Sequence, residues 1–259
     1  MIEIKNVSFS YGDRLVLDSL SFDVRDGEFV AVLGANGAGK SSLVKLISGL
    51  NSPTKGSICL NGKDISAYGA MELARLRAVL EQECSLAFDT SVLDVVLLGR
   101  FPYSKFSTSL SDEKIAKSAL ARVDLSGFEN RLYNRLSGGE KRRVQFARTL
   151  AQLGDESALK GKALLLDEPS AGLDPSHVHK TLSAAKRVAE AGASVIAVLH
   201  DPNMASIYAD KILLLKDSKI LDFDSPKNSI TAEKLELTYG AKCKIISDGG
   251  LNFALFLNR

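Results

Sequence analysis

A glycine-rich segment near the N-terminus has the residue types and spacing of a phosphate-binding loop. Residues 34–41 read GANGAGKS and fit the pattern G-x-x-x-x-G-K-[ST]. In such a loop backbone N–H groups surround one anion, Lys40 adds positive charge near the β and γ phosphates, and the Ser41 hydroxyl can hold Mg²⁺. The helix-patterned stretch that begins at Ser42 points its positive end at the same place. The predicted nucleotide contacts are Gly34, Asn36, Gly37, Ala38, Gly39, Lys40, Ser41 and Ser42.

Two adjacent carboxylates follow a second apolar segment. Ala163–Leu166 leads directly into Asp167 and Glu168, and Pro169 then prevents the strand from continuing. Successive side chains of a strand point to opposite faces, so the two carboxylates are expected to divide the work. Asp167 is predicted to face Mg²⁺, directly or through water, and Glu168 the water that attacks the γ-phosphate. A polar strand end in solvent is the alternative, and the accompanying phosphate loop disfavours it.

A third segment, Ser137-Gly138-Gly139-Glu140, precedes a helical pattern that runs to Leu153. Ser137 and Glu140 have the S-x-x-E spacing of a capping box, which needs no glycine between them. Glycines at these two positions leave a helix N-terminus free of side chains, as a second anion site requires. From the residues alone, a purely structural cap and an anion site both remain open.

These residues need a scaffold that brings strand ends together. The segments 29–33, 163–166 and 194–199 are apolar at consecutive positions, as strands of a parallel sheet covered on both faces are. The first 24 residues instead alternate with a period of two, which predicts a half-buried antiparallel sheet. Helical periodicity without strands fills 91–100, 111–123 and 140–153. The predicted fold class is α/β, with ligands bound at the carboxyl ends of the strands.

Composition narrows the class of protein. The 33 basic and 31 acidic residues give a net charge of +2, too small a bias to indicate nucleic acid as a partner. Cys59, Cys84 and Cys243 are scattered, so neither a disulfide framework nor a zinc site is expected, and a reducing cytoplasm is the default. No apolar run approaches the roughly 20 residues that span a bilayer. If the protein works at a membrane, another chain must supply the pore.

The order of these motifs resembles that of the ATP-binding subunits of ABC transporters. The residues LSGGE at 136–140 stand between a phosphate loop and LLLDEP at 164–169, and the resemblance covers nearly the whole chain. It implies one domain, residues 1–259, with a P-loop NTPase (RecA-like) core and an antiparallel β subdomain in 1–88 and 160–224. An inserted α-helical signature subdomain would occupy 89–159 and a C-terminal extension 225–259.

The resemblance also assigns roles to single residues. Tyr11 would stack on adenine, Gln82 would sense the γ-phosphate and help to hold Mg²⁺, and His200 would orient Glu168 and the attacking water. Lys40 would stabilise the transferring phosphoryl group. The family implies a head-to-tail homodimer, in which each ATP lies between one phosphate loop and the partner's Ser137, Gly138 and Gly139, with Asp174 in the adjoining loop.

Each of these residues also has a simpler interpretation. Tyr11 could be an aromatic residue at a strand end, Gln82 an ordinary polar loop residue, and His200 a hydrogen-bonded core histidine. His177 and His179 lie about 200° apart on a helix, so surface positions are predicted for them and a zinc site is disfavoured. The basic residues at 141, 142, 143 and 148 are predicted to form a solvated helix face.

Two segments point to a class of transporter. The residues GRFP at 99–102 resemble a segment of the subunits that import iron-siderophores, haem and cobalamin, where it lines the groove for a permease coupling helix. The long connection 153–162 after ARTLAQL resembles that of haem-importer ATPases. The resemblance therefore implies haem import, with siderophore or cobalamin import as the alternative, through a permease dimer fed by a substrate-binding protein. The chain would lie peripherally on the cytoplasmic face of the bacterial inner membrane. A soluble ABC ATPase that assists iron–sulfur assembly is the alternative from another class.

Overall fold

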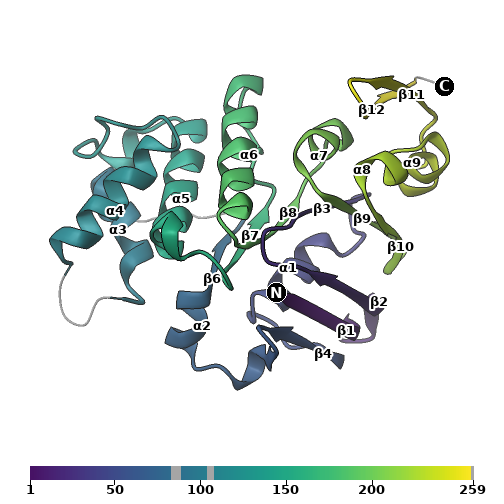
Figure 1. Ribbon diagram of the computed structural model, residues 1–259, viewed down its shortest axis with the longest axis horizontal. Helices are drawn as coiled ribbons and strands as arrows, with labels where there is room; N and C mark the ends of the chain where they lie inside the picture. Colours follow the sequence, from purple (N-terminus) through teal and green to yellow (C-terminus); the bar gives the residue numbers. More distant parts are fainter. Residues whose placement is uncertain (83–88, 104–107, 258–259) are drawn as a thin grey trace.

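A six-stranded sheet runs through the centre of the computed structural model, which describes residues 1–82, 89–103 and 108–257 (Figure 1). Its order is β10-β9-β3-β8-β7-β6, and all neighbouring pairs are parallel except β9 with β10. The strands are β3 (Phe29–Gly34), β6 (Arg77–Leu80), β7 (Ala163–Asp167), β8 (Ser194–Val198), β9 (Lys211–Lys216) and β10 (Lys219–Asp224). The expected parallel sheet is confirmed, and β9 and β10 form an antiparallel hairpin at one of its edges.

The central strands are buried on both faces. In β3, Ala31 and Leu33 belong to the core beneath the helices, whereas Val30 and Val32 belong to the core that faces the antiparallel sheet. Successive strand side chains point to opposite faces, so a strand between two cores must be apolar at every position. This double burial explains the uninterrupted apolar segments of the sequence.

A four-stranded antiparallel sheet of order β2-β1-β4-β5 covers one side of the central sheet, with helix α1 between the two (Figure 1). Its members are β1 (Ile2–Tyr11), β2 (Arg14–Val24), β4 (Lys55–Leu60) and β5 (Lys63–Asp64), and α1 is Lys40–Ile47. A loop of five residues, 35–39, joins β3 to α1. Because both elements are buried, the two ends of this loop are held in place.

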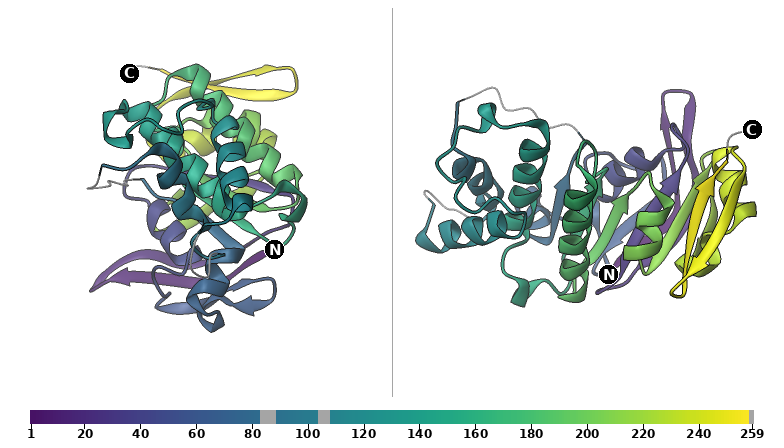
Figure 2. Two further views of the ribbon diagram at one scale, coloured as in Figure 1. Left: turned by 90° about the vertical axis from the view of Figure 1, so that its left-hand side faces the viewer. Right: turned by 90° about the horizontal axis from the view of Figure 1, so that it is seen from above.

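Helices α2 (Ala70–Leu76) and α5 (Gly138–Leu153) pack against β6, and α3 (Val92–Leu97) and α4 (Leu110–Ala121) pack against α5. Helices α3, α4 and α5 form the end of the molecule opposite the C-terminal hairpin (Figure 2). The predicted helical stretches are confirmed, although the first ends in a 3₁₀ turn, Leu98–Arg100. Helix α5 packs against β6, which is an edge strand of the central sheet.

The remaining helices are α6 (Pro175–Glu190), α7 (Pro202–Tyr208), α8 (Pro226–Ser229) and α9 (Ala232–Tyr239), followed by the hairpin of β11 (Cys243–Asp248) and β12 (Leu251–Phe256). Asn203 of α7 fastens this hairpin, because its amide donates to the carbonyl of Ala254 (3.2 Å) and its side-chain oxygen accepts from the N–H of Ala254 (2.7 Å). The C-terminal extension is therefore docked on the helix that follows His200.

Cys59 and Cys243 are free thiols, whereas Cys84 lies outside the described residues. Within the described ranges, none of the helices combines the length and the apolar character needed to cross a membrane.

The GRFP segment at 99–102 is held by close contacts, yet it presents the apolar side chain of Phe101. A Cβ on Gly99 would lie 2.2 Å from the carbonyl oxygen of Arg148, so this close approach to α5 requires glycine. The buried Arg100 donates from Nε to Asp112 (2.8 Å) and from Nη1 to the carbonyl of Ala151 (2.8 Å). Phe101 is 68% exposed, so the segment combines a fixed base with an apolar contact surface.

We expect Arg100→Ala to lower the free energy of unfolding by about 3 kcal/mol, because it leaves the carboxylate of Asp112 buried without its cation. Urea unfolding at pH 7 measures the loss. Lys117→Ala is the matched control, because Lys117 pairs with Glu113 on the exposed surface of α4, the helix that carries Asp112, and its loss should change the stability far less. Equal losses in the two variants would contradict a structural role for the buried pair.

Candidate functional site

The site forms where three parallel strands end at one edge of the central sheet. The phosphate loop follows β3, Asp167 ends β7 with Glu168 next in the chain, and His200 stands two residues after β8. Because β8 lies between β3 and β7, the three segments emerge side by side. This is the edge at which parallel α/β sheets bind ligands.

The phosphate loop is held in a conformation that only its glycines permit. Gly37 and Gly39 have φ values of +82° and +98°, and a Cβ on Gly39 would lie 2.6 Å from the side chain of Leu17. Lys40 is buried and donates from Nζ to the carbonyls of Gly34 (2.7 Å) and Ala35 (2.9 Å). Burial lowers the pKa of Lys40 below its usual value. A phosphate at the loop would therefore meet a lysine already held in place at the start of α1.

One pocket joins this loop to the tip of the first hairpin. It is lined by Tyr11, Arg14, Val16, Asn36, Gly37, Gly39, Lys40, Ser41, Ser42 and Glu168. The ring of Tyr11 packs edge-on against Phe9, with centroids 4.8 Å apart, and Tyr11 remains 51% exposed. This leaves ring surface free to stack on a flat base. Arg14 was not predicted, although the two-residue turn Gly12-Asp13 pairs it with Tyr11 and could have indicated it.

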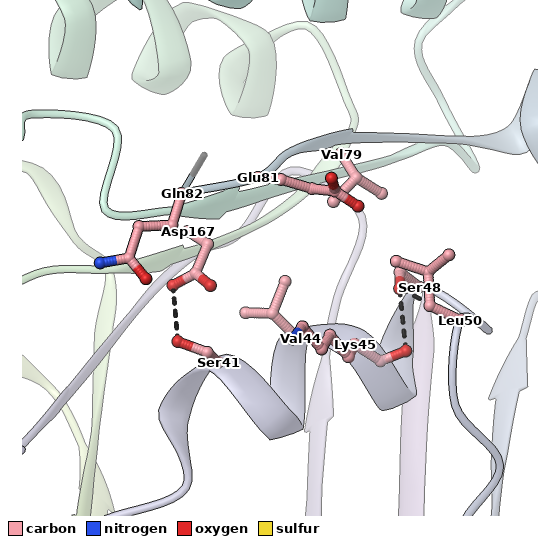
Figure 3. Close-up of a pocket in the computed structure, with 9 residues that line it drawn as sticks. All are labelled: Ser41, Val44, Lys45, Ser48, Leu50, Val79, Glu81, Gln82 and Asp167. Atoms are coloured by element: carbon pink, nitrogen blue, oxygen red, sulfur yellow. Dashed lines mark hydrogen bonds between the residues drawn. The ribbon is translucent and has the colours of Figure 1, made fainter. Parts of the chain in front are cut away.

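A second pocket contains the oxygen donors expected to hold a metal ion (Figure 3). Ser41 at the start of α1 donates to Oδ1 of Asp167 (3.2 Å), and Gln82 lines the same pocket. Burial raises the pKa of Asp167, so a cation would stabilise its ionised form. Three oxygen-bearing side chains of this kind fit Mg²⁺. The described part of the chain has no group of three or more His, Cys, Asp or Glu residues placed to hold a metal. Mg²⁺ bound beside Asp167 would take its remaining ligands from phosphate oxygens and water.

Glu168 is held by the ends of two other strands. Gln82, two residues after β6, donates from Nε2 to Oε2 of Glu168 (3.1 Å), and Nε2 of His200 lies 2.7 Å from Oε1. Glu168 has a φ of +52°, a left-handed conformation that is strained for a non-glycine residue. The strand thus ends at Asp167. The left-handed turn at Glu168 adds to the alternation of the strand in directing the two carboxylates apart.

The structure does not bring Ser137, Gly138, Gly139 or Asp174 into these two pockets. Ser137 and Glu140 form the expected capping box at the start of α5. Apart from the adjoining residues of α5 itself, no described atom lies within 4 Å of a Cβ placed on Gly138, so packing does not require glycine there. A Cβ on Gly139 would lie 3.5 Å from the side chain of Leu173, which places this helix start beside the loop before Asp174.

The two other histidines have structural partners. Asp174 caps α6, accepting from the N–H of His177 (3.0 Å), and Nδ1 of His177 lies 2.6 Å from its carboxylate. His179 instead contacts the hydroxyl of Tyr208 through Nδ1 (2.8 Å). The two side chains therefore contact different residues, and they form no shared metal site.

The prediction of a solvated basic face on α5 is wrong for Arg142 and Arg143. Arg142 contacts the loop after β6 and the end of β7, whereas Arg143 donates to the carbonyls of Val123 (3.1 Å) and Asp124 (3.2 Å). Their partners are backbone carbonyls, which every residue type carries. No residue pattern could have indicated these contacts.

Comparison with known proteins finds similar sequences and similar structures. The profile described as "ABC transporter" matches residues 17–171. Hemin import ATP-binding proteins of Gloeobacter violaceus and Deinococcus radiodurans are each 42% identical, over 95% and 99% of this chain and 90% and 97% of their own lengths. A metal-chelate type ABC transporter in an inward-facing conformation superposes with a TM-score of 0.80 at 28% identity, covering 99% of this chain and 96% of that one. A dimeric bacterial ABC transporter cassette gives 0.75 at 28% identity, covering 87% and 99%.

Proposed function

The chain belongs to the ABC transporter family of ATPases, and we propose from this premise that it powers the import of haem through a separate membrane permease. The observation that carries the ATPase chemistry is the placement of Glu168 between Gln82 and His200, opposite the phosphate loop. The cargo is supported by the hemin import proteins that match nearly the whole chain.

The residues of the site divide the reaction among them. Tyr11 stacks on adenine while the loop N–H groups and Lys40 bind the phosphates, which neutralises charge that grows on the transferring phosphoryl group. Glu168 orients the attacking water and accepts its proton, and His200 holds Glu168 in position through the 2.7 Å contact. Gln82 couples the loop after β6 to the same carboxylate.

Ser41, Asp167 and Gln82 are the residues that would hold Mg²⁺. The bound ion would supply electrostatic stabilisation to the phosphate oxygens. The buried carboxylate of Asp167 and the Ser41 hydroxyl that donates to it are already adjacent, so ligand placement needs little rearrangement.

A second copy of the chain completes each site. Ser137 and Gly138 are exposed at a helix N-terminus, and neither lines the two pockets of its own chain. In a head-to-tail homodimer this helix start meets the γ-phosphate held by the partner's loop, with Asp174 in the neighbouring segment. ATP binding would close the dimer and hydrolysis would reopen it, which moves a permease dimer between two states.

The apolar contact surface at Leu98 and Phe101 supports a permease as the partner. Both side chains are largely exposed on a base fixed by Arg100, as a docking surface for a coupling helix requires. The chain would then lie on the cytoplasmic face of the bacterial inner membrane, with a substrate-binding protein delivering cargo from the other side.

Reconstitution with its permease tests the proposed cargo. With the complex in liposomes and its binding protein present, haem is expected to stimulate ATP turnover several-fold, whereas a ferric siderophore or cobalamin leaves the rate at its basal level. Stimulation by one of those ligands and not by haem would reassign the cargo. Failure to form a complex with any polytopic membrane protein would favour the iron–sulfur assembly alternative.

A further inference from the structure

Arg142 joins three parts of the site through one guanidinium group. It lies in the second turn of α5, the helix that begins at Gly138. Its Nη1 donates to the carbonyls of Glu81 (2.6 Å) and Gln82 (2.8 Å), in the loop after β6. Its Nη2 donates to the carbonyls of Asp167 (2.7 Å) and Glu168 (2.8 Å), at the end of β7. One side chain on α5 therefore hydrogen bonds both to the loop after β6 and to the end of β7.

These contacts bear directly on the conformation of Glu168. Its left-handed φ of +52° needs support from its surroundings, because a β-carbon makes this region unfavourable. The carbonyl of Glu168 accepts from Arg142 and also from the N–H of Ala171 (3.1 Å). Hydrogen bonds from a charged donor are stronger than neutral ones, so Arg142 is a main contributor to this support.

The same guanidinium also holds the partner of Glu168. Gln82 donates to Oε2 of Glu168 through its side chain, while its backbone carbonyl accepts from Arg142. Arg142 thus sets the backbone on both sides of the hydrogen bond between Gln82 and Glu168. A planar fork with donors on two edges suits this task, whereas the single ammonium of lysine cannot reproduce it.

We propose that Arg142 is a positioning residue for ATP hydrolysis, which holds Glu168 and Gln82 in register from the signature helix. This inference rests on the proposed catalytic role of Glu168. Because Ser137 and Gly138 begin the same helix, displacement of that helix would pass through Arg142 to the water-activating carboxylate. In these two segments Arg142 hydrogen bonds to the backbone carbonyls of residues 81, 82, 167 and 168, and its role is to position the groups that act on the substrate.

The test compares Arg142→Ala and Arg142→Lys with Arg143→Ala in the full-length chain. Arg143 is the matched control, because it is an adjacent arginine on the same helix that also donates to backbone carbonyls, but to those of Val123 and Asp124. Steady-state turnover of Mg-ATP gives kcat, binding of a fluorescent ATP analogue gives Kd, and thermal unfolding reports on folding. We expect kcat to fall about tenfold in both Arg142 variants, as loss of a positioning contact does, with Kd within threefold of wild type. Arg143→Ala should keep its kcat within twofold.

A further readout separates positioning from a general structural role. In single-turnover hydrolysis of radiolabelled ATP, Arg142→Ala added to Glu168→Gln should cause no further loss, because the carboxylate it positions is already gone. A loss of kcat below threefold in either Arg142 variant, an equal loss in Arg143→Ala, or an additive loss in the double variant would overturn the inference. If Arg142→Ala does not fold, Arg142→Lys decides. Absence of nucleotide binding by the wild-type chain would instead refute the proposed function.

Discussion

Glu168→Gln is expected to lower ATP turnover on the order of 10³-fold while nucleotide affinity stays close to that of the wild type. The amide retains the size of the side chain and can still hydrogen bond to His200 and Gln82, but it cannot accept a proton from the attacking water. The phosphate loop, Lys40 and Tyr11 are unchanged, so the binding contacts remain. Phosphate release measures turnover, and equilibrium titration with Mg-ATP measures affinity.

Glu81→Gln is the matched control for this prediction. Glu81 precedes Gln82 in the same loop and lines the metal pocket, but only its backbone carbonyl takes part in the contacts with Arg142. Turnover in Glu81→Gln should remain within a fewfold of the wild type. A Glu168→Gln chain that hydrolysed ATP at the wild-type rate would assign the general base to another group.

Ser137→Arg is expected to abolish ATP-driven pairing of two chains. Ser137 is exposed at the start of α5, and open space surrounds the neighbouring Gly138, so a long side chain can be accommodated in the monomer. In the head-to-tail dimer the same side chain would occupy the place of the partner's γ-phosphate. Light scattering with Mg-ATP, in a Glu168→Gln background that does not consume the nucleotide, should show a dimer for Ser137 and a monomer for Ser137→Arg.

Ser137→Ala separates the surface effect from the loss of the helix cap. The Ser137 hydroxyl accepts from the N–H of Glu140 (3.3 Å), so either substitution removes this cap and costs about 1 kcal/mol of stability. Alanine adds no bulk at the helix start, so the Ser137→Ala chain should still form the dimer, although at a higher ATP concentration than the chain with Ser137. A persistent dimer in Ser137→Arg would exclude this helix start from the interface.

The sequence alone was sufficient for the features that depend on neighbouring residues. The phosphate loop, the capping box at Ser137 and the carboxylate pair at 167–168 are each contiguous, so each can be recognised in a short stretch of sequence. Strand type was also readable, because burial on two faces demands apolar residues at every position and burial on one face demands alternation. The parallel arrangement then implied that β3, β7 and β8 would end at one edge.

Less could be predicted where polar contacts involve backbone atoms remote in sequence. The C-terminal hairpin was not foreseen, and Asn203 fastens it through the backbone of Ala254.

The sequence by itself determined the chemistry of the site, because nucleotide binding and water activation require particular side chains in short, recognisable patterns. Only the tertiary structure decided how that chemistry is held together. From the sequence, Arg142 was predicted to be one of several solvated charges on a helix face. In the structure it contacts four carbonyls in two distant segments and supports the left-handed conformation of Glu168. A carbonyl is common to all residues, so its position in space, and therefore its partner, is set by the packing of α5 against the sheet and leaves no mark in the order of residue types.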